Sequence, residues 1–307
     1  MVSTSDAARS LSRSKKENGM RIALVPTMGC LHEGHLSLLR TAAARADFVF
    51  CSIYVNESQF APGEDYQSYP RRLEADLEKL RELGCVNCSF TPKAMYAQGT
   101  CIGGGEDGHQ TWVTVERLQQ PLCGKSRPIF FRGVATVVAK LLNIVEPDVV
   151  FFGMKDYQQY CIIRQMAIEL DFPVEVVACP IVRETDGLAM SSRNLRLSPT
   201  NRERAPVIYK ALLHIVACLD KMRDGKSEVI CLSRLLSQAA EQIERETGGA
   251  VEYMSSLNSS TLVPITEISV VSSSDGADKG GVPIVIATAV VLDGVRLIDN
   301  VVWPRLK

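Results

Sequence analysis

The sequence has 307 residues, a hydrophobic content of 46% and a formal net charge of −1. A chain of this length and composition can build one large domain or two ordinary ones. Its near-neutral charge gives no general attraction to nucleic acid or to anionic membranes, and no apolar run reaches the ~18 residues that a membrane-spanning helix needs.

The first 19 residues contain serine, arginine and lysine but no apolar core of a secretory signal. We therefore expect a flexible leader over residues 1–19. The alternative is a weak transit peptide, which the acidic residues Asp6 and Glu17 disfavour.

Ten cysteines are scattered along the chain, several of them in apolar runs where a thiol behaves as a small hydrophobic side chain. This usage is typical of a reducing compartment and predicts a cytoplasmic protein. Cys85 and Cys88 form a C-x-x-C pair that Cys101 and His109 could complete as a zinc set. Because the spacing matches no standard zinc site, we expect ordinary buried thiols.

The first strong pattern is a short apolar strand, predicted over 20–25, that leads into a turn over 26–35. From Leu36 onward, apolar residues recur with the spacing of a helix face. Gly29 and Gly34 allow the backbone of the turn to approach a ligand closely. The stretch is therefore predicted to be a strand-to-helix turn at a binding site.

Two histidines lie in this turn. His32 and His35 are three residues apart, so on the first turn of a helix they share a face. The N–H groups at a helix start attract anions, so the two imidazoles could hold a triphosphate and supply protons as charge moves. The alternative interpretation is a pair of helix-surface histidines without a chemical role.

Two later strands also end in polar residues. A strand predicted over 47–55 leads to Asn56 and Gln59, whose amides can hydrogen-bond a small polar substrate. An ordinary turn is the alternative there.

A buried strand predicted over 148–152 leads through glycine into a helix start that contains Lys155, Asp156 and Gln159. Lys155 is a point charge suited to phosphate, and Asp156 can cap the helix or hold a ribose or a metal.

Two further charged residues are weaker candidates. Asp76, on a helix predicted over 73–83, could aid a metal, although a lone helix carboxylate is usually solvated. Arg127 precedes a helix predicted over 134–144 and could face a phosphate, although a lone arginine is more often a surface charge.

Strands and helices alternate from Arg21 to Cys179, which predicts an α/β fold with a doubly wound, parallel, Rossmann-like sheet over 20–181. The three polar strand ends are expected to face one crevice, because ligands of such sheets bind at the carboxyl ends of strands. A glycine-rich stretch over 97–110 lacks the G-K-[ST] of a P-loop, so ATP would bind through the histidine turn.

The remaining residues, 182–307, are predicted to form a smaller α+β lid domain. Ser191, Ser192 and Arg193 could make a mobile phosphate clamp there, or simply a serine-rich turn. A flexible hairpin loop is expected over 272–281. The expected elements are two helices over 198–222 and 227–247 and four strands over 251–254, 265–271, 283–292 and 296–303.

Together, these motifs resemble the pantoate–β-alanine ligases, or pantothenate synthetases, of the H-x-G-H nucleotidyltransferase superfamily. The resemblance covers nearly everything from Arg21 to Trp303. The stretches that carry it are 26–35, Val55-Asn56 with Gln59-Phe60, 132–138, Phe152-Gly153 with 155–159, 186–194 and 296–300.

The resemblance implies that ATP and pantoate form pantoyl adenylate and pyrophosphate, and that β-alanine then attacks the acyl carbon to give pantothenate, a coenzyme A precursor, and AMP. It implies that His32 contacts phosphate and that His35 is the proton donor. It also implies a homodimer through the first domain and a Mg²⁺ contact at Asp76.

The resemblance further implies sets of site residues. The implied catalytic residues are His35, His32, Lys155, Ser191, Ser192 and Arg193. The implied ATP contacts are Met28, Gly29, Cys30, Leu31, His32, Glu33, Gly34, His35, Gly153, Met154, Lys155, Asp156, Val182, Met190, Ser191, Ser192 and Arg193. The implied contacts to pantoate and β-alanine are Gln59, Gln159, Asn56 and Arg127.

The chain departs from the family pattern at a few positions. Glu57 stands where proline is usual, Ile129-Phe130 where Gly-His is usual, Met154 where glutamate is usual and Thr185 where proline is usual. These departures bear on affinity and loop order more than on the type of reaction. The alternatives to the ligase are another H-x-G-H nucleotidyltransferase and a non-catalytic nucleotide-binding protein.

Overall fold

In the computed structural model the chain divides into two compact units, Met1–Val182 (unit 1) and Arg183–Lys307 (unit 2). The division falls one residue after the predicted boundary. Cys101, most of the glycine-rich stretch and all of the predicted hairpin loop lie outside the described residues. The structure describes residues 1–96, 108–224, 229–269 and 283–304.

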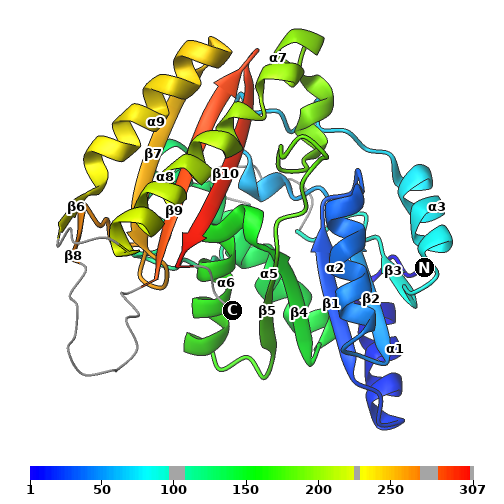
Figure 1. The fold of residues 1–307 in the computed structure, drawn as a ribbon. Coiled ribbons are helices and arrows are strands. Elements are labelled where there is room, and N and C mark those ends of the chain that lie inside the picture. Colours follow the sequence, from blue (N-terminus) through cyan, green and yellow to red (C-terminus); the bar gives the residue numbers. More distant parts are fainter. Residues whose placement is uncertain (97–107, 225–228, 270–282, 305–307) are drawn as a thin grey trace. The chain divides into compact units, whose positions relative to one another are not determined.

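Unit 1 is built on a five-stranded parallel sheet with the spatial order β3-β2-β1-β4-β5 (Figure 1). The order reverses between β1 and β4, which makes their carboxyl ends the switch point of a doubly wound sheet. The predicted α/β fold is thereby confirmed. The strands are β1 (Ile22–Thr27), β2 (Phe48–Ile53), β3 (Cys88–Phe90), β4 (Val149–Gly153) and β5 (Glu175–Cys179).

Helices cover both faces of this sheet. Val25 of β1 packs with Leu39 of α2 and Leu80 of α3 on one face. Because strand side chains alternate, the fully buried Leu24 points to the other face, where α5 and α6 lie. The helices are α1 (Ser5–Glu17), α2 (Glu33–Ala43), α3 (Leu73–Leu83), α4 (Cys123–Ser126), α5 (Phe130–Val145) and α6 (Tyr157–Glu169), with short 3-10 helices η1 (Glu57–Gln59) and η2 (Met154–Asp156).

The prediction of a flexible leader is wrong, because α1 is an integral helix of unit 1. Thr4 caps it by accepting a hydrogen bond from the Ala7 N–H at 3.3 Å. The fully buried Ser12 donates to the carbonyl of Val145 at the end of α5. Alanine and serine on the buried face let α1 approach α5 closely, and that face carries too little hydrophobicity to be recognised from the sequence.

Unit 2 packs two helices on a three-stranded antiparallel sheet with the order β10-β9-β7. Its elements begin with η3 (Ser192–Arg196) and continue with α7 (Pro199–Arg204), α8 (Val207–Asp224), β6 (Val229–Cys231), α9 (Leu232–Thr247), β7 (Ala250–Asn258), β8 (Glu267–Ser269), β9 (Ile284–Leu292) and β10 (Val295–Trp303).

Two details of unit 2 differ from the sequence-based expectation. The long helix predicted from residue 198 is broken into α7 and α8, and Pro206, which has no N–H for a helical hydrogen bond, lies at the break. The start of the predicted second helix instead forms the short strand β6, which pairs with β8.

Across the described ranges, the helices are all too short or too polar to cross a membrane.

Candidate active site

The turn between β1 and α2 is held in an unusual backbone conformation. Gly29 has φ = +81° and Cys30 has φ = +52°, so two successive residues are left-handed. At Gly29 a side chain would also collide with its surroundings, because a Cβ would lie 2.9 Å from Oδ2 of Asp76 and 3.1 Å from Cγ2 of Ile53. Glycine at this position is therefore required by both conformation and space.

The two histidines cap the start of α2 reciprocally. Nδ1 of His32 accepts a hydrogen bond from the Gly34 N–H at 3.2 Å, and Nδ1 of His35 accepts one from the His32 N–H at 3.3 Å. The ring centroids are 4.1 Å apart. Since both Nδ1 atoms are acceptors, each neutral ring carries its proton on Nε2 and can donate from that side.

Both rings are neutral at neutral pH. Burial, assisted by the charges of Lys155 and Lys79, lowers the pKa of His32 to about 4. Burial, then the neighbouring His32, then the same two lysines lower the pKa of His35 to about 3. The site therefore presents two uncharged N–H donors beside two cations.

The second polar strand end lies next to this turn. Lys155 and Asp156 are in η2, directly after β4, and β4 pairs with β1 in the sheet. Both residues act on the pKa of His32, Lys155 lowering it and Asp156 raising it, which places their charges close to the imidazole.

The third strand end reaches the same place through Met28. Nε2 of Gln59 donates to the sulfur of Met28 at 3.3 Å, and Nδ2 of Asn56 donates to Oε1 of Gln59 at 2.9 Å and to the carbonyl of Gly133 at 3.2 Å. Asn56 and Gln59 are 1% and 6% exposed. A Cβ on Gly133 would lie 2.3 Å from the Ser58 carbonyl oxygen, so glycine lets α5 approach these amides. The three strand ends thus lie at one edge of the sheet, and the shared crevice expected from the sequence stays a prediction.

The two neighbouring glutamines of α6 lie in different surroundings. Gln158 is buried and holds a loop, because its amide accepts from the Cys123 N–H at 3.1 Å and donates to the carbonyls of Leu118 and Pro121 at 2.9 and 2.6 Å. Gln159, the predicted substrate contact, is partly exposed. This split leaves Gln159 as the glutamine suited to a ligand.

Arg127 lies beside the amide cluster, but a carboxylate balances its charge. Its guanidinium donates to Glu64 at 2.9 and 2.6 Å and to the carbonyl of Gln59 at 3.4 Å. The ring of Phe130 stacks on it at 3.9 Å. The unusual Phe130 is thereby explained as a cover for this ion pair. The other departure nearby, Glu57, accepts a hydrogen bond from the Tyr54 hydroxyl at 2.5 Å.

Asp76 does not have the surroundings expected of a metal ligand. It is 1% exposed, and its two oxygens accept the N–H groups of Cys30 and Leu31 at 2.7 Å each. Lys79, one turn later on α3, donates to the carbonyl of Leu31 at 2.5 Å. Within the described ranges, no three histidine, cysteine or acidic side chains gather as a metal site. Sequence reasoning missed Lys79, for which the only available signal was its i+3 spacing from Asp76.

The serine–arginine segment belongs to unit 2. Ser191 caps η3 by accepting from the Arg193 N–H at 3.2 Å, and the Asn194 side chain donates to the Ala189 carbonyl at 3.1 Å. Val182 is the last residue of unit 1. Ser192 and Arg193 therefore lie in a capped 3-10 turn of unit 2, and Met190 precedes the capping residue.

Arg183, the first residue of unit 2, makes a salt bridge with Asp299 of β10. Arg183 donates to both oxygens of Asp299 at 2.7 and 2.9 Å and stacks on Tyr209 at 3.4 Å. Gly187 has φ = +96°, and a Cβ there would lie 3.0 Å from the Tyr209 ring. The motif residues Gly187 and Asp299 are thus structural.

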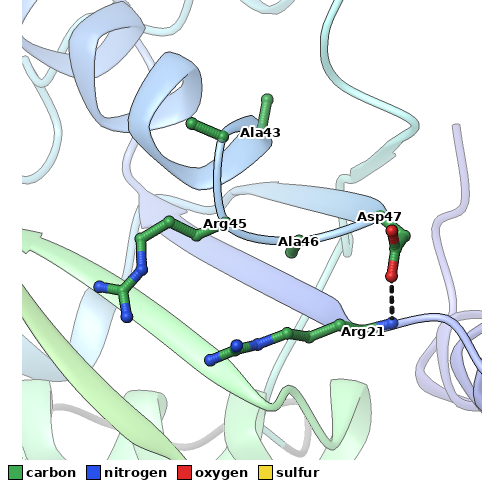
Figure 2. Close-up of a pocket in the computed structure, with 6 residues that line it drawn as sticks. Arg21, Ala43, Arg45, Ala46 and Asp47 are labelled. Carbon is green, nitrogen blue, oxygen red and sulfur yellow. Dashed lines mark hydrogen bonds between the residues drawn. The ribbon is translucent and has the colours of Figure 1, made fainter.

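A surface hollow of about 480 Å³ lies at the opposite end of the unit 1 sheet (Figure 2). Arg21 and Arg45 line it, and Asp47 accepts a hydrogen bond from the Arg21 N–H at 2.8 Å. Both arginines pair with Glu175, at 3.0 and 2.8 Å. Because ligands of parallel sheets bind at the carboxyl ends of strands, this hollow is not the candidate active site.

Comparison with known proteins gives a consistent result. The sequence profile described as Pantoate-beta-alanine ligase matches residues 1–302, a range that includes α1. A relative named Pantoate--beta-alanine ligase from Oryza sativa subsp. japonica is 44% identical, and the match covers 96% of this chain and 94% of the relative. One named Pantothenate synthetase from Acetivibrio thermocellus is 41% identical over 98% of each chain.

Solved structures agree. A pantothenate synthetase from Thermus thermophilus matches with a TM-score of 0.80 and 37% identity over 98% of both chains. A pantoate-beta-alanine ligase from Francisella tularensis, complexed with beta-gamma ATP and beta-alanine, matches with a TM-score of 0.71 and 31% identity over 98% of this chain and 97% of that one.

Proposed function

This chain belongs to the pantoate–beta-alanine ligase family, and we propose that it acts through a pantoyl adenylate formed at the carboxyl ends of β1, β2 and β4. The protein is an ATP-dependent ligase that joins pantoate and β-alanine to form pantothenate. The single observation that carries the site assignment is the convergence of the two imidazoles, Lys155 and the buried amides at one edge of the sheet.

The two steps of the proposed reaction have different leaving groups. In the first, a carboxylate oxygen of pantoate attacks the α-phosphorus of ATP, the bond to the bridging oxygen breaks, and pyrophosphate leaves with its electron pair. In the second, the amine of β-alanine attacks the acyl carbon, the carbon–oxygen bond breaks, and AMP leaves as the amine loses a proton. Adenylation thus replaces a poor leaving group with a good one.

The turn and Lys155 are proposed to hold the triphosphate. Negative charge builds up on pyrophosphate in the first step, and the N-terminal end of α2, the Nε2–H groups of His32 and His35 and the ammonium of Lys155 can stabilise it. Because both imidazoles are neutral, we propose that His35 contributes as a hydrogen-bond donor, with no net transfer of its proton. This refines the sequence-based interpretation of His35 as a proton donor.

The amides are proposed to hold pantoate. A glutamine amide offers both a donor and an acceptor, which suits a molecule that carries hydroxyl and carboxylate groups. Gln59 is fixed by Asn56 and Met28, and Gln159 enters from α6. Arg127 supports the Gln59 backbone in this proposal and has its charge balanced by Glu64.

The clamp of unit 2 is proposed to act on the phosphates when substrates are bound. Ser191, Ser192 and Arg193 combine hydroxyl donors with a guanidinium, the pairing that charge-assisted phosphate recognition uses. Met190 and Val182 are proposed nucleotide contacts on the same resemblance.

Mg²⁺ does not fit a site made of protein side chains alone. Both oxygens of Asp76 already accept backbone N–H groups, and the described residues gather no ligand set. We propose instead that the ion arrives on the phosphates of ATP and keeps several waters, as Mg²⁺ usually does. The active site would supply its shape and its cations without a dedicated metal cage.

Two wider proposals rest on the family and the cysteines. The homodimer through unit 1 is proposed on the resemblance, and light scattering during size-exclusion chromatography tests it. A cytoplasmic location suits the described cysteines, which are all free thiols. Fractionation of the source cells tests the location.

The decisive experiment for the function is exchange of labelled pyrophosphate into ATP. We expect exchange that requires pantoate and does not require β-alanine, together with a mass corresponding to pantoyl adenylate. Exchange that depends on a phosphorylated acceptor would instead indicate another nucleotidyltransferase. Absence of exchange with any acid would indicate a nucleotide-binding protein.

A further inference from the structure

Helix α3 contacts the backbone of the histidine turn from outside. The turn is part of the β1–α2 connection, whereas Asp76 and Lys79 are in the connection between β2 and β3, more than forty residues later in the chain. Asp76 accepts the N–H groups of Cys30 and Leu31 at 2.7 Å each, and Lys79 donates to the carbonyl of Leu31 at 2.5 Å. Both polar groups of the Leu31 backbone are therefore held by α3.

Resting on the function proposed above, we propose that Asp76 and Lys79 are positioning residues that fix the turn and aim the two imidazoles at the triphosphate. Leu31 immediately precedes His32, the residue that caps α2, so a displacement of Leu31 carries His32 with it. The reciprocal hydrogen bond between the His32 N–H and His35 then transmits the displacement to the second ring.

The turn needs such support because of its backbone. Cys30 is a non-glycine residue at φ = +52°, a conformation that costs free energy and persists only where surrounding contacts enforce it. The Cys30 N–H is one of the two groups that Asp76 holds. A carboxylate that is 1% exposed and accepts two N–H groups is strongly committed to this geometry.

Helix α3 also packs against the rest of unit 1 through an apolar side chain. Leu80, the residue after Lys79, is 4% exposed and belongs to the hydrophobic cluster that contains Leu31 of the turn, Leu39 of α2 and Val49 of β2. Gly84 ends α3 with φ = +71°. The apolar contact of Leu80 thus holds α3 beside the turn, and its two polar side chains add directed hydrogen bonds to the backbone there.

The experiment compares Asp76→Asn and Lys79→Met with matched controls on the same helix. Glu74→Gln changes an exposed carboxylate of α3, and Arg81→Met removes a cation that pairs with Glu78 at the surface. Lys79→Arg tests rescue, because it restores a long cationic donor. Steady-state kinetics with ATP and pantoate, pyrophosphate exchange and thermal unfolding are measured for each variant.

We expect Asp76→Asn to lower the exchange rate constant about 100-fold and Lys79→Met about 10-fold, since misplacing catalytic groups by about 1 Å has effects of this size. The loss should appear in kcat more than in the KM for pantoate. Lys79→Arg should recover most of the rate. The exchange rate constants of both control variants should stay within about 2-fold of that of the unchanged protein, because surface substitutions usually have small effects.

A second readout follows the turn itself. Cys30 is partly exposed, so its alkylation by iodoacetamide can be quantified by peptide mass spectrometry and compared with that of Cys218, in unit 2. Release of the turn should raise the alkylation rate of Cys30 several-fold in Asp76→Asn and Lys79→Met and leave Cys218 unchanged. This measurement stays valid for any variant that remains folded, whatever its activity.

Three outcomes would overturn the proposal. One is lost activity with unchanged Cys30 alkylation. Another is an exchange rate constant in Lys79→Met equal to that of the unchanged protein. The third is restoration of exchange in Asp76→Asn by excess Mg²⁺ alone, which would make Asp76 a metal contact. If the unchanged protein showed no pantoate-dependent exchange, the ligase function would fail while the alkylation rates still decided whether α3 holds the turn.

Discussion

The two ends of the parallel sheet in unit 1 use polar side chains in different ways. At the amino end, Arg21 and Arg45 share Glu175, and these side chains are 39% to 49% exposed. At the carboxyl end, Asn56 and Gln59 are buried and hydrogen-bonded to each other. Water screens the first group, whereas the second must keep its partners or lose much of its hydrogen-bond energy.

This contrast shows that charge and a hollow do not by themselves identify a site. The amino-end hollow is lined by two guanidiniums (Figure 2). Both of them already pair with the carboxylate of Glu175. At the carboxyl end, two neutral imidazoles have both Nδ1 atoms occupied, which directs their donors elsewhere. The position in the fold and the direction of the donors are what distinguish the two ends.

The largest expected effect is at His35. Replacement by alanine removes a donor from the site of developing charge, and we expect pyrophosphate exchange to fall by about 10³-fold or more. The fold should remain intact by circular dichroism, because the ring contributes one capping hydrogen bond. Near-normal exchange by this variant would remove the functional distinction between the two ends.

The next largest effects are expected at the glutamine amides Gln59 and Gln159. Gln59→Ala and Gln159→Ala should each raise the KM for pantoate by about 10-fold, the loss of roughly one hydrogen bond to a charged group, with a smaller change in kcat. Steady-state kinetics at saturating ATP measures this. The buried neighbour Gln158 provides the contrast, since Gln158→Ala should lower the melting temperature through the loop that it holds. An unchanged pantoate KM in Gln159→Ala would exclude Gln159 from the site.

The buried histidines at the carboxyl end of the sheet should also make the stability of the protein depend on pH. The pKa of His32 is lowered from its ordinary value of 6.5 to about 4. Between these two pH values, the unfolded chain therefore binds a proton at this histidine that the folded chain does not bind. The stability linked to this histidine is fully present above pH 6.5 and decreases as the pH falls toward 4.

Replacing His32 with glutamine should therefore reduce the loss of stability between pH 6.5 and 4, measured by urea unfolding at several pH values, and leave the part that comes from His35. For the same reason kcat should show no histidine titration between pH 6 and 8. A steep kcat change with a midpoint near 6.5, abolished in His32→Gln, would show that the ring is charged in the working enzyme.

The smallest effect is expected at the amino end. Arg45→Ala breaks an exposed ion pair with Glu175, and such pairs are worth about 0–1 kcal/mol. Exchange activity and both substrate KM values should match those of the unchanged protein. A rise in the KM for ATP would assign a ligand role to the hollow and invalidate the comparison.

Much of unit 1 follows from local pattern alone. The alternation of short apolar strands with amphipathic helices determined the parallel sheet, and the positions of His32, Asn56 and Lys155 after strands determined which edge would carry the site. These features depend on a period of two or of 3.6 residues and on chain direction, which the sequence displays directly.

The tertiary structure decided the features that depend on partners distant in the chain. In the folded chain, the expected leader is a helix that packs on α5, and Phe130 stacks over Arg127. Asp76 accepts the N–H groups of Cys30 and Leu31, which lie 46 and 45 residues before it. The side chain of Asp76 has the same chemistry on a solvated helix face as beneath a backbone turn. Only the folded arrangement determines which N–H groups it meets, and with them the direction in which the histidines point.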